Sequence, residues 1–178
     1  IDILVINSGH SPYGGLDELS EPQWYEAFEL LLLSAVRLAR LVLPSMRANK
    51  QGDIVFLGSS SVREPPPHHL LSTVMRLGVA GFAKTLSREV ARDNIRVNHI
   101  SPGYFDTGRI RDRIDSLAKE KSISRAEATA QVTGALPLGR IGTAEELAEL
   151  VAFVVSRRAG FLVGSNITID GGSGRSPL

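Results

Sequence analysis

Residues 1–9 read IDILVINSG, an almost wholly apolar run that is closed by Ser8-Gly9. A strand with both faces buried has this composition, and such strands belong to parallel sheets that are covered by helices. Three later apolar runs also end in small-residue loops: residues 54–57 before Gly58-Ser59-Ser60, residues 95–100 before Ser101-Pro102-Gly103, and residues 166–169 before Asp170-Gly171-Gly172. The sequence therefore predicts a set of parallel strands with polar turns at their carboxyl ends.

Helical segments separate these strands. Apolar side chains recur at helical spacing in residues 21–50, 71–92 and 143–155. Pro44 is expected to kink or end the first of these helices near its last turn. Thr143 is a good N-cap for the third. The polar stretch 107–134 predicts one or two mobile helices over a site.

Alternating strands and helices predict an α/β fold, a doubly wound parallel sheet of the Rossmann-like type. No internal repeat or low-complexity linker divides residues 1–178, so we expect one domain. In open α/β sheets, ligands bind beyond the carboxyl ends of the strands. The loops that follow the predicted strands should therefore form one shared site.

Composition limits the classes of partner. A net charge of +1 gives no electrostatic reason to expect nucleic acid or an anionic membrane. The chain has no cysteine, its apolar stretch at residues 30–33 is far too short to span a bilayer, and no signal peptide precedes the first strand. We expect a cytoplasmic protein. Metal binding is not expected, because histidines 10, 68, 69 and 99 form no spaced pair on a helix face.

Taken together, the motifs resemble the short-chain dehydrogenase/reductases. The segments that carry the resemblance, in the family's order and spacing, are residues 5–9 (VINSG), 54–59 (IVFLGS), 96–98 (RVN), 101–107 (SPGYFDT), 137–140 (PLGR), 145–147 (EEL) and 170–172 (DGG). The resemblance covers essentially the whole chain. It implies a Rossmann-like fold, a hydride transfer that uses NAD or NADP, and a small-molecule carbonyl substrate.

One departure concerns the cofactor phosphates. The family begins with a glycine-rich turn between its first strand and helix, where backbone N–H groups meet the pyrophosphate. No such turn follows a strand in this sequence. The chain is therefore expected to resemble the C-terminal two-thirds of a family member and to lack the first strands.

A second departure concerns the catalytic residues, which in the family are Ser, Tyr, Lys and Asn. Ser59 matches the serine that polarises the carbonyl, but Ser72 stands at the tyrosine position and Arg76 at the lysine position. Counted from Trp24, the asparagine position falls on Leu31. The chain most resembles an atypical branch of the 3-ketoacyl-(acyl-carrier-protein) reductases.

The resemblance also implies roles for residues of the site. Asn7, Gly9, Pro102, Gly103 and Thr107 correspond to residues at the nicotinamide end of the cofactor, with Asn7 also bridging strands. Arg76 either binds the cofactor's ribose or phosphate or forms an ion pair on its helix.

An aliphatic hydroxyl is a poor proton donor, so Ser72 is expected to cap the helix that begins there. His68, His69 and Tyr104 are the alternative donors. Asn98 and the Asp170-Gly171-Gly172 turn are expected to be structural.

Two functions remain open. The chain is either an NAD(P)-dependent oxidoreductase with an altered acid/base apparatus or a non-catalytic relative that binds a ligand or a partner. In either case the resemblance implies a homo-dimer or tetramer, with interfaces on the Trp24 helix, the Leu77 helix and the C-terminal strand.

Overall fold

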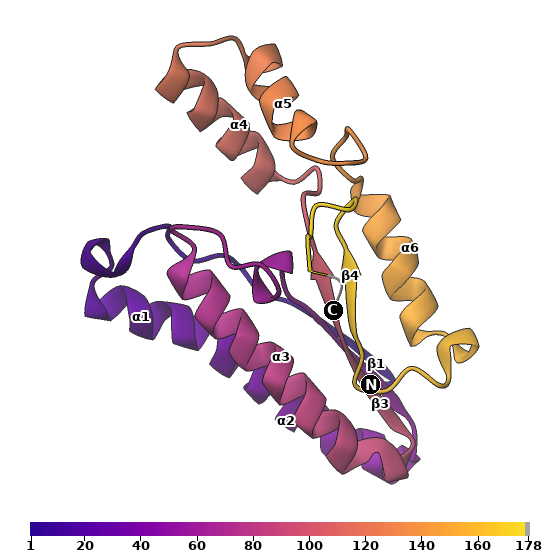
Figure 1. Ribbon diagram of the computed structural model, residues 1–178. Coiled ribbons are helices and arrows are strands. Elements are labelled where there is room, and N and C mark those ends of the chain that lie inside the picture. Colours follow the sequence, from indigo (N-terminus) through magenta and orange to yellow (C-terminus); the bar gives the residue numbers. More distant parts are fainter. Residues whose placement is uncertain (177–178) are drawn as a thin grey trace.

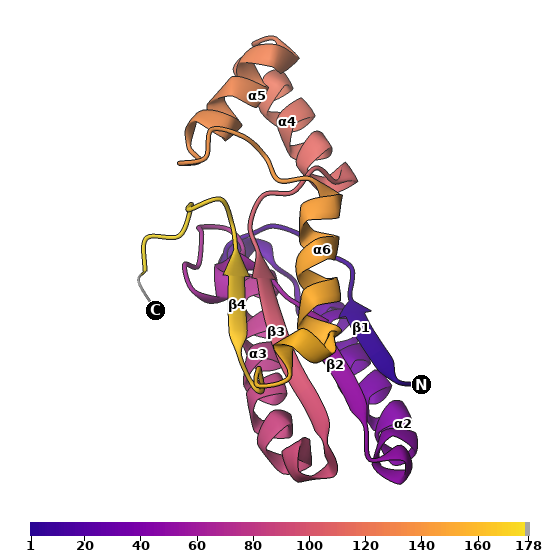
Figure 2. The ribbon, with the colours of Figure 1, turned by 90° about the vertical axis from the view of Figure 1, so that its right-hand side faces the viewer.

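A computed structural model describes residues 1–176. It contains one sheet of four parallel strands in the order β1-β2-β3-β4 (Figures 1 and 2). The strands are β1 (Ile3–Asn7), β2 (Gly52–Leu57), β3 (Ile95–Pro102) and β4 (Asn166–Ile169). All four predicted strands are present, and their carboxyl ends lie at one edge of the sheet because every pairing is parallel.

Helices cover both faces of this sheet, which confirms the predicted fold class. The helices are α1 (Glu21–Ala27), α2 (Ser34–Asn49), α3 (Leu70–Val90), α4 (Gly108–Lys121), α5 (Arg125–Gly134) and α6 (Ala144–Val155). Figure 2 shows α2 and α3 behind the sheet and α6 in front of it. The larger core lies between the sheet and α2–α3, where Phe56, Met46 and Val90 are fully buried.

The predicted long first helix is continuous in the chain but irregular in its hydrogen bonding. Residues Phe28–Leu33 form a π-helical segment between α1 and α2. Such segments inside α-helices often occur at functional sites. Pro44 does not end the helix, which continues to Asn49 because Met46 and Leu43 still pack on the sheet.

The second long helix, α3, corrects the expected role of Ser72. This helix begins at Leu70 with His69 as its N-cap, so Ser72 lies inside the first turn rather than at the cap. The Ser72 side chain is buried, and its hydroxyl accepts a hydrogen bond from Arg76 Nε at 3.3 Å. The prediction that Ser72 caps the helix is wrong.

The polar segment after β3 folds as two helices, as expected. Helices α4 and α5 extend beyond the carboxyl ends of the strands (Figure 1) and pack on each other through Ile114, Leu117 and Ala128. Within residues 1–176, no helix is both long enough and apolar enough to cross a membrane, and no three potential metal ligands gather in one place.

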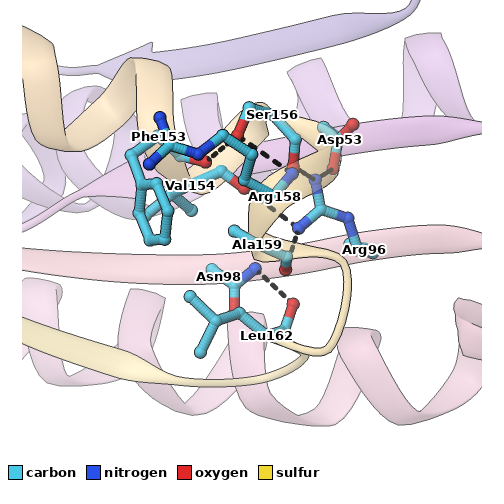
Figure 3. A network of polar contacts seen from close by, with 9 residues as sticks. All are labelled: Asp53, Arg96, Asn98, Phe153, Val154, Ser156, Arg158, Ala159 and Leu162. Carbon is cyan, nitrogen blue, oxygen red and sulfur yellow. Dashed lines mark hydrogen bonds and ion pairs between the residues drawn. The ribbon is translucent and has the colours of Figure 1, made fainter.

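A polar network fixes α6 against the sheet (Figure 3). Arg96 on β3 pairs with Asp53 at 2.6 Å and donates hydrogen bonds to carbonyl groups at and beyond the C-terminus of α6, those of Val154, Ser156 and Ala159. The Asn98 side chain donates to Leu162 O and accepts from Ser165 N. The expected structural role of Asn98 is confirmed.

The turn after β4 is structural as well. Gly171 and Gly172 have φ angles of +64° and +81°, which glycine adopts without a steric penalty. The Asp170 carboxylate accepts hydrogen bonds from the backbone N–H groups of Gly172 and Gly174.

Candidate active site

A cleft of about 860 Å³ lies at the carboxyl ends of the strands. The loops after all four strands line it, as the positions of the polar strand ends predicted, together with residues of α3, α4, α5 and α6. The lining includes Asn7, Gly9, Ser59, Ser72, Arg76, Pro102, Gly103 and Thr107. Every residue that the sequence assigned to catalysis or to the cofactor therefore borders one cavity.

Ser59 lies at the start of the loop that follows β2. Its backbone is extended and its side-chain oxygen accepts a hydrogen bond from Ser61 N at 3.2 Å, which makes it the N-cap of a short 3₁₀ turn, Ser60–Val62. The Ser59 O–H donates to no residue within the described range 1–176. Because no described residue takes its proton, the Ser59 hydroxyl can donate a hydrogen bond to a carbonyl oxygen in the cleft.

Arg76 joins the ends of two strands. Its Nη1 donates to Leu57 O at 3.3 Å and to Gly58 O at 3.2 Å, and its Nη2 donates to Gly9 O at 2.9 Å. Burial, together with the charge of Arg109, lowers the pKa of Arg76 to about 10, so the guanidinium remains charged at neutral pH.

These contacts limit what Arg76 can offer a ligand. A guanidinium has five N–H donors, and the bonds to Ser72 and to the three carbonyl groups use four of them. No carboxylate among the described residues pairs with Arg76, so the expectation of an ion-paired helix residue is wrong. One N–H of Nη2 remains for a ligand.

The nicotinamide end of a dinucleotide fits the residues present. A carboxamide and a ribose need hydrogen-bond donors and acceptors, and the side chains of Asn7 and Thr107 border the cleft without a hydrogen bond to any other described residue. Asn7 therefore bridges β1 and β2 only through its backbone, in register with Leu57. A Cβ at Gly103 would lie 2.7 Å from that of Asp170, so glycine is required for the β3 and β4 loops to approach so closely.

The alternative proton donors differ in position. His69 borders the cleft, and burial, followed by the charges of Arg109 and Arg113, lowers its pKa. Tyr104 also borders the cleft and is exposed. His68 is outside the cavity lining, with Nδ1 3.4 Å from the Glu18 carboxylate.

Two further residues that border the cleft were not predicted from the sequence. Tyr13, from the loop after β1, and Arg109, from the first turn of α4, border the cleft and contact each other. They are 96 positions apart in sequence. The position of Tyr13 after a strand end is the one indication in the sequence that it could reach the site.

Leu31, at the position of the family's asparagine, lies in the π-helical segment. It is fully buried, in a cluster with Leu71, Met75 and Ala27. An apolar side chain in an apolar cluster holds no water, as the sequence indicated.

These features define a class of protein: a parallel α/β sheet whose glycine- and serine-bearing strand ends surround a cleft, as in Rossmann-like nucleotide-binding proteins. The family model described as "Enoyl-(Acyl carrier protein) reductase" matches residues 1–174. The chain therefore belongs to the short-chain dehydrogenase/reductase family.

Known relatives agree with this assignment. The chain is 33% identical to the 3-oxoacyl-[acyl-carrier-protein] reductase FabG of Escherichia coli over 97% of its own length and 66% of the relative's. For the NADPH-dependent reductase BacG of Bacillus subtilis, the identity is 33% over 99% of the chain and 68% of the relative. The chain thus spans about two thirds of the length of these proteins.

A solved structure supports the same family assignment. The L-sorbose reductase of Gluconobacter frateurii, described in complex with NADPH and L-sorbose, superposes with a TM-score of 0.93 at 35% identity. The match covers 98% of this chain and 67% of that one.

Proposed function

We propose that this protein is an NAD(P)-dependent oxidoreductase that interconverts a carbonyl and a secondary alcohol. The observation that carries the proposal is the shared cleft, where Ser59 and the candidate cofactor-binding residues Asn7 and Thr107 face one cavity. The named relatives include a 3-oxoacyl-[acyl-carrier-protein] reductase, an NADPH-dependent reductase, and an L-sorbose reductase described in complex with NADPH. When bound, the cofactor supplies the hydride.

The residues of this chain then have separate tasks. Ser59 donates a hydrogen bond to the carbonyl oxygen and polarises the carbonyl group as negative charge develops there. Asn7 and Thr107 hold the carboxamide and the ribose of the nicotinamide half. Arg76 holds the strand ends in place and offers its remaining N–H and its positive charge at the floor of the cleft.

The test uses the complete natural protein with NADPH and NADH. We expect cofactor consumption with a 3-oxoacyl thioester or with L-sorbose, and a fall in kcat of about 100-fold or more for Ser59→Ala. Ser45→Ala, an exposed serine on α2, is the control and should leave kcat unchanged. The absence of both cofactor consumption and a thermal shift on adding the cofactor would contradict the proposal.

A non-catalytic relative is the second candidate. It is favoured by the buried state of Ser72 and by the use of four Arg76 donors within the protein. Such a protein would bind NADPH without consuming it, and Ser72→Tyr with Arg76→Lys would create activity. Wild-type turnover equal to that of the double variant would exclude this candidate.

We also propose that the protein forms a homo-dimer or tetramer and works in the cytoplasm. The oligomer is supported by apolar side chains on the outer surface of α2 and α3, including Leu41, Val74 and Leu77, which are exposed in the single chain. The near-neutral net charge gives no reason to expect a nucleic-acid partner.

A further inference from the structure

Tyr13 and Arg109 form a polar pair at the wall of the cleft. Arg109 Nε and Nη2 both donate hydrogen bonds to the Tyr13 hydroxyl oxygen, at 2.9 and 2.7 Å. The guanidinium carbon also lies 4.9 Å from the centre of the Tyr13 ring. Since two cationic N–H groups fill the acceptor positions of the oxygen, the O–H of Tyr13 is left to donate to a ligand.

This tyrosine lies close to the position of the missing one. The N–H of Gly14 donates to His68 O at 2.8 Å, which ties the Tyr13 loop to the segment that leads into α3. The Tyr13 ring packs on His69, with the ring centres 4.5 Å apart. His69 is the N-cap of α3, and Ser72 lies in the first turn of that helix. Tyr13 is therefore next to the helical turn that carries Ser72.

The position of Arg109 needs an explanation beyond helix stability. It lies in the first turn of α4, where the helix dipole disfavours a cation. The other arginines of α4 and α5 do form ion pairs: Arg111 with Asp106, Arg113 with Glu120, and Arg125 with Asp115. Arg109, half-buried, has no carboxylate partner within residues 1–176, and its hydrogen bonds go to Tyr13 alone.

From this geometry we infer that Tyr13 is the proton donor to the carbonyl oxygen and that Arg109 is its positioning residue. The inference rests on the proposed function. The pair supplies a proton donor and a neighbouring cation, which the family obtains from tyrosine and lysine. Here the two residues come from a loop after β1 and from the start of α4.

The chemistry balances as follows. As the carbonyl carbon accepts a hydride with its electron pair from the reduced cofactor, the carbon–oxygen π bond breaks, and the oxygen takes the proton of the Tyr13 hydroxyl. The products are the secondary alcohol, the oxidised cofactor and a Tyr13 phenolate. The two N–H groups of Arg109 stabilise this phenolate. Tyr13 is 48% exposed, so it regains its proton from water.

The test replaces each tyrosine of the complete protein by phenylalanine, and the sequence contains three: Tyr13, Tyr25 and Tyr104. For Tyr13→Phe, which keeps the ring on His69, we expect kcat with a 3-oxoacyl thioester or L-sorbose to fall by about 100-fold or more. The dissociation constant for NADPH, measured by fluorescence, should change less than about twofold, because the loss concerns proton transfer rather than binding. Tyr25→Phe, on the exposed surface of α1, is the matched control and should match wild type.

Two further measurements separate contact with the substrate from a structural role. With fluorotyrosine incorporated in place of tyrosine, the ¹⁹F signal of Tyr13 should move when the alcohol product is added to the NADP complex, and that of Tyr25 should not. Arg109→Met should lower kcat with little change in KM, and Arg109→Lys should restore part of the loss.

The outcomes distinguish this inference from the proposed function. If wild type turns over and Tyr13→Phe is equally active, or if only Tyr104→Phe is inactive, Tyr13 is not the donor and the proposed function stands. If wild type neither binds nor consumes NADPH, the proposed function fails and the role of Tyr13 is overturned with it.

Discussion

At the scale of single residues, Arg76 connects the site to the stability of the fold. Four of its hydrogen bonds are made inside the protein, three of them to carbonyl groups at the ends of β1 and β2. A lysine at this position has three donors on one atom and cannot span the same carbonyl groups. Arginine therefore supports strand ends that a smaller catalytic side chain would leave without partners.

We predict that Arg76→Met lowers the free energy of unfolding by about 2 kcal/mol or more, because a carbonyl left without a partner costs about 1–3 kcal/mol. Urea denaturation measures the change. Arg88→Met, on the exposed side of the same helix, should stay within about 0.5 kcal/mol of wild type. If Arg76→Met and Arg88→Met are equally stable, water must satisfy the carbonyl groups that Arg76 binds in the wild type.

His99 gives a second prediction at this scale. It is buried on β3, and its Nδ1 lies 2.9 Å from Asn166 Oδ1, while Nε2 has no partner among the described residues and faces Gly58. Burial lowers its pKa from the usual 6.5. Because the folded pKa lies below the unfolded one, the neutral ring's contribution to stability is complete above about pH 6.5 and is lost as the pH falls through the folded pKa.

The free energy of unfolding of wild type should therefore decrease as the pH falls below about 6.5. His99→Gln, which can still donate to Asn166, should show a shallower decrease. Denaturant titrations over a series of pH values measure both slopes. Parallel curves for the two proteins would contradict the assignment of the decrease to His99.

Single residues were predictable from the sequence where a motif determines their place relative to a strand. Asn7 ends β1, and Ser59 and Thr107 follow β2 and β3 by short distances, so all three border the predicted cleft. The position of Ser72 was predicted wrongly, because the start of α3 depends on how the proline-containing loop meets the Tyr13 loop. The pair of Tyr13 and Arg109 was not predicted, because nothing in the local sequence links residues so far apart.

At the scale of elements, side-chain caps decide where the shorter helices begin. Thr143 Oγ1 accepts from Glu146 N at 3.2 Å, and the Glu146 carboxylate accepts from Thr143 N at 2.8 Å. Arg140 holds the same carboxylate with two hydrogen bonds. The sequence predicted this cap correctly because the pattern is local, whereas the π-helical segment depends on packing in the folded protein and has no such local pattern.

Thr143→Ala should lower the free energy of unfolding by about 1 kcal/mol. Chemical denaturation at neutral pH measures this loss. Thr133→Ala, at the end of α5, is the comparison, since its hydroxyl bonds only to carbonyls of its own helix. A larger effect at Thr133 than at Thr143 would show that the cap does not limit the stability of α6.

Glu146 makes the same cap sensitive to acid. Its hydrogen bonds with Arg140 and then with Thr143 N lower its pKa from 4.5 to about 2. Because the pKa of Glu146 is lower in the folded than in the unfolded protein, its carboxylate stabilises the fold above about pH 4.5. This stabilisation is lost as the pH falls toward 2. Glu146→Gln should therefore be less stable than wild type at neutral pH and equal to it near pH 2. A difference that persists at pH 2 would exclude the charge as its cause.

At the scale of the whole molecule, parallel pairing explains why the site was predictable in outline. Four strands that run in one direction bring four loops to one edge of the sheet, so strand positions in the sequence determine which loops meet. The wall formed by α4 and α5 follows from tertiary packing instead. The sequence therefore predicted the floor of the cleft and helices from residues 107–134 over it, but it did not predict that Arg109 borders the cleft.

The outer surface of α2 and α3 carries exposed apolar side chains. Leu41 is 76% exposed, and Val74 and Leu77 are also exposed, on helices α2 and α3, which lie side by side. A Cβ placed at Gly81 would meet no atom within 4 Å, so this part of α3 allows another helix to approach closely. Apolar surface of this kind, on neighbouring helices, is typical of contacts between subunits.

If two copies associate through this surface, a charge at its centre should separate them, because the charge would lose its hydration at the interface. We expect the complete protein to have the mass of a dimer or tetramer in light scattering after gel filtration, and Leu77→Arg to have a smaller mass with an unchanged circular dichroism spectrum. Leu16→Glu, which alters a leucine that is even more exposed but lies outside α2 and α3, should keep the mass of wild type. An unchanged mass for Leu77→Arg would assign the interface to another surface, such as the one around the fully exposed Phe161 before β4.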